Sequence, residues 1–180
     1  NEEFNGLIEI ENDGGYALNG STTTSVNGDK DFYLIKVDKD GNKQSEYSYG
    51  NPGEEVFYGI YELPNGNLYN VGYTEFFGGG GGDGVFISTD STGWWIDGFT
   101  FGGNQNETLN SITIGKNGSI LLGGKTRSYG NGQDDALLIL ADTLYPGMDT
   151  SIVSFQDFIP LNVRDRKSTR LNSSHGYISY

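Results

Sequence analysis

Apolar and polar residues alternate in short runs along this chain, and glycine, asparagine or aspartate clusters separate the runs. Such runs predict β-strands joined by tight turns. In the first part of the chain we expect four strands, at about Asn5–Ile10, Tyr16–Ser21, Phe32–Val37 and Ser45–Tyr49. The third run is almost continuously apolar, which is typical of a strand covered on both faces, and the fourth is expected to be half-buried. No segment shows helical periodicity over the length that a helix needs.

This pattern returns twice at a spacing of 52 residues. The glycine of the first turn stands at positions 14, 66 and 118, and the third run recurs as Val85–Thr89 and Ala136–Ala141. After Asp142 the third copy has a longer turn, beyond which we match Val153 and Phe155 to Tyr47 and Tyr49. Other positions that keep the spacing are Ile8, Ile60 and Ile112; Gly20, Gly72 and Gly124; Thr22, Thr74 and Thr126; Asp31, Asp83 and Asp135; and Asp38, Asp90 and Asp142.

Four hairpin-linked strands in about fifty residues match one blade of a β-propeller. The sequence therefore predicts an all-β fold of three consecutive four-stranded antiparallel blades, at residues 1–50, 51–103 and 104–157, with 158–164 unassigned. Propellers typically close with about four to eight blades. We therefore expect a partial propeller, an open arc with two apolar outer faces that is cut at both ends, whose partners include the remaining blades of the same parent chain.

The last residues, 165–180, resemble the translation of a common short-read sequencing adapter. The match runs from Asp165 to His175 residue for residue, and a six-base index followed by constant bases would encode the remainder. We therefore expect a non-native tail and leave it out of the fold and the function. With the tail excluded, the rest of the chain contains no histidine, because His175 is the only one.

The composition narrows the range of functions. The chain carries 24 acidic against 11 basic residues, a net charge of −13. Nucleic acids and anionic membrane surfaces require clustered lysine and arginine, so we expect neither as a partner. Cysteine is absent, which excludes disulfides and thiolate metal sites, and no apolar run approaches the ~20 residues of a membrane-inserted helix.

Candidate chemistry is sparse. Without a native histidine or cysteine, the usual Ser-His-Asp and Cys-His catalytic triads cannot form. We therefore assign no catalytic residue and no cofactor. Asp38 and Asp40 are candidate metal ligands in an Asp-Lys-Asp-Gly segment, but the calcium-loop spacing is wrong and we favour a turn role for Asp38. Trp94 and Trp95 are the candidate ligand-binding residues, for which we favour packing over stacking on a sugar.

Three segments carry a family resemblance: Asp13–Thr22, Asp31–Gly41 and Tyr49-Gly50. They resemble the roughly fifty-residue propeller repeats of bacterial secreted and cell-surface proteins. The resemblance implies an extracellular or cell-surface location and a scaffold or binding role. Because the repeats are symmetric and contain no asymmetric polar cluster, we expect this role to be non-catalytic, with an unknown protein or glycan as ligand. The alternative is a fragment of a carbohydrate-active propeller enzyme whose site lies in missing blades or an adjoining domain.

Overall fold

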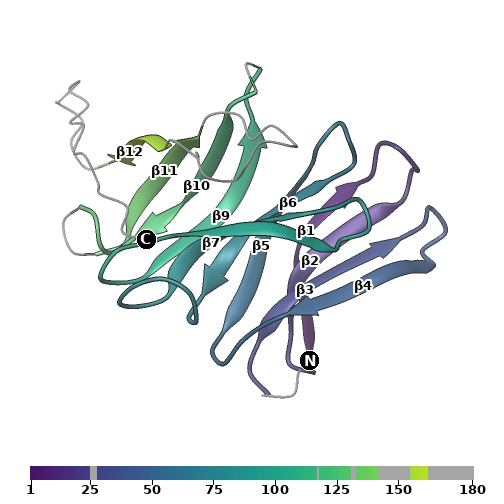
Figure 1. Cartoon of the computed structure of the whole chain (residues 1–180), viewed down its shortest axis with the longest axis horizontal. Coiled ribbons are helices and arrows are strands. Elements are labelled where there is room, and N and C mark those ends of the chain that lie inside the picture. Colours follow the sequence, from purple (N-terminus) through teal and green to yellow (C-terminus); the bar gives the residue numbers. More distant parts are fainter. Residues whose placement is uncertain (25–27, 117, 131–132, 142–154, 162–180) are drawn as a thin grey trace.

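A computed structural model describes residues 1–24, 28–116, 118–130, 133–141 and 155–161, the last of these as backbone only (Figure 1). All regular structure in these ranges is β-strand, which confirms the predicted all-β class. The predicted tail, 165–180, lies outside the described residues, as do 162–164. The strands are β1 (Glu2–Glu9), β2 (Tyr16–Thr22), β3 (Asp31–Val37), β4 (Lys43–Tyr49), β5 (Glu55–Glu62), β6 (Leu68–Thr74), β7 (Asp83–Thr89), β8 (Trp95–Phe101), β9 (Glu107–Ile114), β10 (Ile120–Thr126), β11 (Asp135–Ala141) and β12 (Phe155–Leu161).

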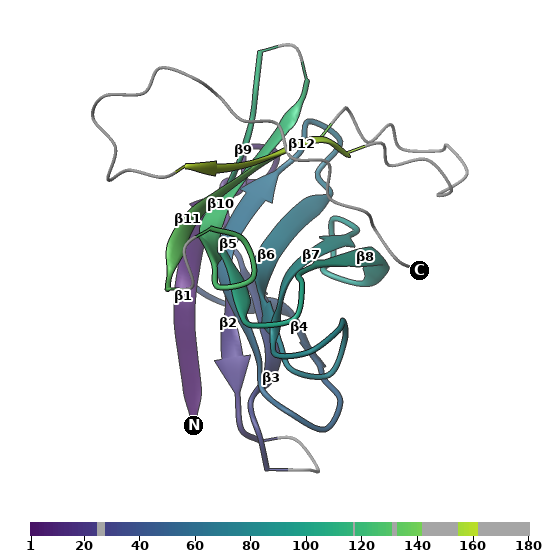
Figure 2. The same ribbon diagram turned by 90° about the vertical axis from the view of Figure 1, so that its left-hand side faces the viewer.

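The described strands form three antiparallel sheets of four consecutive strands each: β1–β4, β5–β8 and β9–β12, here called the first, second and third sheets. Within each sheet the strands lie in chain order, and each strand pairs antiparallel with the next. Figures 1 and 2 show the sheets side by side as an open row that does not close on itself. Strand β5 contacts β1 and β2 of the first sheet, and β9 contacts β5 and β6 of the second.

The core lies between neighbouring sheets. One buried cluster joins Ala17 and Leu34 of the first sheet to Ile60 and Leu68 of the second. A larger cluster joins the second and third sheets; it contains Tyr69, Val71, Phe86, Phe101, Leu109, Ile120, Leu122, Leu137, Ile139 and Ala141. The second sheet is therefore covered on both faces. This agrees with the apolar run in β7, which is almost wholly buried, whereas β4 and β8 are only partly buried.

The register corrects one predicted equivalence. Leu7 pairs with Leu18, and Ile60 pairs with Asn70, which stands 52 residues after Leu18. Leu7, and not Ile8, is therefore the counterpart of Ile60. The cause is the first hairpin turn, which is one residue longer than its counterparts and shifts β1 by one position. The same shift ends β1 at Glu9 rather than at Ile10, and the strand also begins three residues earlier than predicted, at Glu2.

The last strand also differs from the prediction. We matched Phe155 to Tyr49, the last residue of β4, but Phe155 begins β12 and pairs with Ala141. In the first sheet the equivalent partner of Val37 is Lys43, the first residue of β4. The strand therefore runs to Leu161, past residue 157 where the third repeat was expected to end. The earlier match relied on single residues across a longer turn, and the strand pairing overrides it.

Candidate functional site

A buried carboxylate lies at each junction between sheets. Glu55, the first residue of β5, is fully buried. Its Oε1 accepts a hydrogen bond from Thr74 Oγ1 at 3.3 Å, and its Oε2 accepts one from the backbone N–H of Asn51 at 3.0 Å. Asn51 belongs to the segment that connects the first sheet to the second. Glu55 thus ties this connection to its own sheet.

The second junction repeats this arrangement. Glu107 is fully buried at the start of β9, and its Oε1 accepts from Thr126 Oγ1 at 2.7 Å. Its Oε2 accepts from the backbone N–H of Gly103, also at 2.7 Å. Each donor stands 52 residues after its counterpart at the first junction. The same contacts therefore hold the connecting segment at both junctions.

An aspartate completes each junction. Asp31 and Asp83 are 5% and 1% exposed, and among the described residues Oδ1 of each is buried without a hydrogen-bond partner. The Asp31 carboxylate occupies the space that a Cβ on Gly50 would need, and Asp83 occupies that space at Gly102. We call these sets the junction clamps. The first contains Asp31, Gly50, Glu55 and Thr74, and the second contains Asp83, Gly102, Glu107 and Thr126.

Burial controls the protonation of two clamp carboxyls. Burial raises the pKa of Glu55 to about 7, and the nearby charges of Asp31 and Asp29 also raise it. The two hydrogen bonds that Glu55 accepts lower this pKa, but by less than burial raises it. Burial likewise raises the pKa of Asp83 to about 6, with a smaller contribution from Glu107. The backbone N–H of Gly79 donates to Asp83 Oδ2 at 2.9 Å and opposes this shift.

An aromatic cluster distinguishes the first junction from the second. Trp95 at the start of β8 packs edge-on against Tyr49 at the end of β4, with ring centroids 5.7 Å apart. Trp94 packs edge-on against Tyr47 at the same separation but is 61% exposed. We call Tyr47, Tyr49, Trp94 and Trp95 the aromatic site. The pair of tryptophans occurs once in the chain.

Three side chains of the first sheet hold the turn that carries these tryptophans. Lys36 Nζ donates to the carbonyl of Ser91 at 2.8 Å, and Ser45 Oγ donates to that of Thr92 at 2.6 Å. The Tyr49 hydroxyl donates to the carbonyl of Gly93. The turn that carries Trp94 is therefore fixed against the neighbouring sheet.

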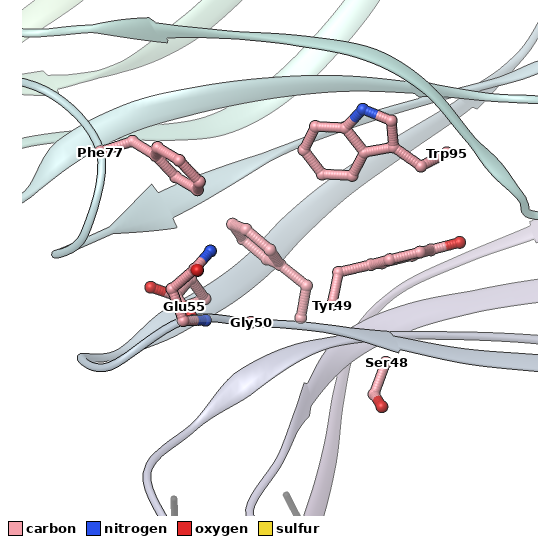
Figure 3. Close-up of a pocket in the computed structure, with 8 residues that line it drawn as sticks. Ser48, Tyr49, Gly50, Glu55, Phe77 and Trp95 are labelled. Carbon is pink, nitrogen blue, oxygen red and sulfur yellow. The ribbon is translucent and has the colours of Figure 1, made fainter.

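A pocket of about 330 Å³ lies beside the aromatic site. Figure 3 shows Phe77 and Trp95 on one side of it and Glu55 and Gly50 on the other, with Tyr49 at one end. Its volume is at the lower end of the range for small-ligand sites. Apolar walls with a few polar groups suit a ligand that has both ring faces and hydroxyls. The full lining is Phe32, Ser48, Tyr49, Gly50, Asn51, Glu55, Phe77 and Trp95.

The candidate metal ligands lie in a turn remote from this pocket. Asp38 Oδ1 accepts from the backbone N–H groups of Asp40 and Asn42 at 2.9 and 2.8 Å. Hydrogen bonds from Asn42 lower the pKa of Asp38. Asp40 instead contacts Lys39 at 2.9 Å. In the part of the chain that the structure describes, no three acidic or histidine side chains are grouped to hold a metal ion.

Asp90 makes the same turn contacts as Asp38. Its Oδ1 accepts from the backbone N–H of Thr92 at 2.8 Å and from that of Trp94 at 2.9 Å. These bonds set the direction in which the chain enters β8. The third member of the series, Asp142, lies outside the described residues.

Sequence analysis singled out both tryptophans but missed the residues that organise them. Glu55 and Glu107 are 52 residues apart, and each stands opposite a recurring threonine, so the spacing carried a signal for the clamps. Lys36 and Ser45 carried none, because their acceptors are backbone carbonyls of another repeat. Trp95 lines the pocket, whereas Trp94 does not.

Comparison with known proteins gives no assignment, because no protein-family model and no curated protein matches the chain. No helix long and apolar enough to cross a membrane occurs in the described ranges.

Proposed function

We propose that this chain forms three consecutive blades of a β-propeller and serves as a non-catalytic binding or scaffold module of an exported bacterial protein. Four-stranded antiparallel sheets in chain order, joined by equivalent clamps, support the blade assignment. The resemblance of Asp13–Thr22 and Asp31–Gly41 to secreted propeller repeats supports an extracellular or cell-surface location. The remaining blades would come from the same parent chain.

The observation that carries the binding proposal is the exposed ring of Trp94. A solvent-exposed tryptophan on a fixed turn presents a flat apolar face at little entropic cost, because few side-chain torsions must be frozen. The adjacent pocket adds Asn51 and Ser48 as hydrogen-bonding groups. A sugar ring offers one apolar face and a rim of hydroxyls, which matches this combination. We therefore propose a glycan as the ligand.

A glycan array on the full chain tests this function. We expect binding to a restricted set of oligosaccharides, and a loss of about tenfold or more in affinity for Trp94→Ala. Phe76→Ala is the matched control, because Phe76 is also an exposed aromatic residue, at 48%, but does not belong to the aromatic site. If Trp94→Ala and Phe76→Ala bind equally well, the aromatic site is not the ligand site.

One observation favours the enzyme alternative. Glu55 lines the pocket, and its pKa of about 7 is in the range of a general acid. However, Glu107 makes the same contacts at the junction that lacks the tryptophans, so a structural role explains both residues. Release of shorter sugars from a bound oligosaccharide, abolished by Glu55→Gln, would favour the enzyme over the binding module.

A further inference from the structure

The pocket at the first junction is walled largely by aromatic rings. Four of the residues that line it are aromatic: Phe32, Tyr49, Phe77 and Trp95. The rings of Tyr49 and Trp95 meet at an interplanar angle of 65°, so they form two adjoining walls rather than one stack. Phe77 lies on the same side of the pocket as Trp95 (Figure 3). Several ring walls around one cavity suit a positively charged ligand, because the faces of aromatic rings are electrically negative.

Carboxylates gather behind these walls. Glu55 is fully buried and lines the pocket, and the charges of Asp31 and Asp29 act on it. Oδ1 of Asp31 and Oδ1 of Asp29 are buried and accept no hydrogen bond from the described residues. Opposite charges attract more strongly through buried protein than through water. A cation in the pocket would therefore be drawn to these carboxylates.

No basic side chain of the described residues compensates this negative charge. The lining contains no lysine and no arginine, and no ion pair between described residues includes Glu55, Asp29 or Asp31. Lys30 stands between the two aspartates in the sequence but pairs with Glu3, at 3.5 Å. The pocket thus combines aromatic walls with acidic groups that have no cation of their own.

The second junction differs from the first at the position of Phe77. Its equivalent, 52 residues later, is Tyr129, whose hydroxyl donates to the carbonyl of Gly102 at 3.0 Å. Burial, followed by the charges of Glu107 and Asp83, raises the pKa of Tyr129, so the phenol lies within electrostatic reach of both carboxyls. A side chain of the chain itself therefore serves the second junction, whereas the first has a phenylalanine there and a pocket beside it.

The groups around the pocket favour an organic cation over a metal ion. Calcium and magnesium take about six or more oxygen ligands, and no three acidic side chains of the described residues are grouped to hold a metal ion. Both carboxylate oxygens of Glu55 already accept hydrogen bonds, from Thr74 and Asn51. A cation that carries N–H donors would leave some of them unpaired, whereas a quaternary ammonium group has none.

We propose that the pocket binds a small quaternary ammonium compound, whose charged group packs among the four rings and is attracted by the carboxylate of Glu55. The volume of about 330 Å³ suits a ligand of this size. The inference concerns the pocket alone, which Trp94 does not line, and it is independent of glycan binding at the aromatic site.

Titration of the full chain with tetramethylammonium chloride, followed by tryptophan fluorescence, tests the proposal. Trp95 lines the pocket, so its emission reports on occupancy. Sodium chloride at equal concentration controls for ionic strength, and tert-butanol is a neutral probe of nearly the same shape. We expect a saturable change with tetramethylammonium and a dissociation constant at least about tenfold lower than that of tert-butanol.

Two matched variants connect the binding to the buried charge. Glu55→Gln keeps the shape of the side chain and removes its charge, and we expect it to weaken tetramethylammonium binding by about tenfold or more at pH 8. Glu107→Gln makes the same change in the second junction clamp, where Tyr129 replaces Phe77, and should leave the affinity unchanged. Circular dichroism must show the native sheet content in both variants.

The pH dependence of the wild-type chain gives a second measurement that needs no variant. Tetramethylammonium favours the ionised form of Glu55, whose pKa is about 7, and the charged groups that face Glu55 are the acidic Asp31 and Asp29. The affinity should therefore rise by up to about tenfold from pH 6 to pH 8. Tetramethylammonium itself does not titrate in this range.

Three results would overturn the proposal: tert-butanol binding as tightly as tetramethylammonium, equal affinities in Glu55→Gln and Glu107→Gln, or an affinity that falls as the pH rises. A free compound and a lipid headgroup can supply the same ammonium group. Binding of choline chloride without sedimentation on phosphatidylcholine vesicles supports the free compound, whereas sedimentation on these vesicles overturns it in favour of the headgroup. A failure of neutral oligosaccharides to bind concerns only the glycan proposal.

Discussion

At the residue scale, the junction clamps explain why glycine follows the aromatic end of the fourth strand. The Asp31 carboxylate fills the position that a Cβ on Gly50 would take, and Asp83 does so at Gly102. The glycine is therefore required for a close approach and not for an unusual backbone angle, since neither residue has a positive φ. The aspartate was recognised as a recurring residue, and the glycine keeps the same spacing of 52 residues, but the sequence could not show that the two touch.

Replacing this glycine should destabilise the protein. We expect Gly50→Ala to lower the free energy of unfolding by about 2–4 kcal/mol, because the new methyl group overlaps a buried carboxylate that cannot easily move. Chemical denaturation measures the change. Gly79→Ala is the matched control, because a Cβ there meets no atom within 4 Å.

A double-mutant cycle connects this effect to the aspartate. If the overlap is the cause, Gly50→Ala should cost much less in an Asp31→Ala background. Equal costs in both backgrounds would show that Gly50 is needed for another reason.

The clamp carboxyls also make stability depend on pH. Glu55 and Asp83 have folded-state pKa values of about 7 and 6, above the values of 4.5 and 3.8 for the free side chains. Between these limits the folded protein binds more protons than the unfolded chain, so stability is greatest at low pH and falls as pH rises. We expect the free energy of unfolding to be lower at pH 8 than at pH 5, by about 1–3 kcal/mol for Glu55.

Denaturation curves at both pH values test this, with Glu55→Gln as the diagnostic variant. Glutamine keeps the shape of the side chain and cannot ionise, so it should flatten the dependence. A protein that gains stability from pH 5 to pH 8 would show that Glu55 and Asp83 are charged and well paired in the folded state.

At the element scale, the hydrophobic pattern predicted every strand of the first sheet to within about three residues. It succeeded because alternation and turn residues are local signals. Its errors came from pairing: the longer first turn displaced β1, and the fourth strand of the third sheet begins where the alignment had placed its end. Pairing depends on contacts between segments, which spacing along one chain does not encode.

The packing of one sheet on the next should be sensitive to its central aromatic contact. Phe57 is fully buried and stacks on Phe32 of the neighbouring sheet. We expect Phe57→Ala to lower the free energy of unfolding by about 3–5 kcal/mol, because it removes a large buried side chain and leaves a cavity. Phe76→Ala, at an exposed ring, should change it by less than about 1 kcal/mol. Similar losses in both variants would argue against a tightly packed junction.

At the scale of the whole molecule, features that recur at both junctions and features that occur at one junction point to different roles. The clamps recur at both junctions and serve the architecture, whereas the aromatic site occurs at one junction and is where a ligand-specific role can reside. Sequence analysis found the tryptophans because they break the repeat. It could not find the pocket, whose walls come from two sheets and the segment between them.

The measurement that tests the binding account most directly is the intrinsic fluorescence of the full chain during titration with a panel of oligosaccharides. The chain has two tryptophans, and both belong to the aromatic site, so the whole tryptophan signal reports on it. We predict a saturable change in emission with at least one oligosaccharide, which is lost in Trp94→Ala although Trp95 still reports. An emission that no member of the panel changes, or a change that persists in Trp94→Ala, would contradict glycan binding at this site.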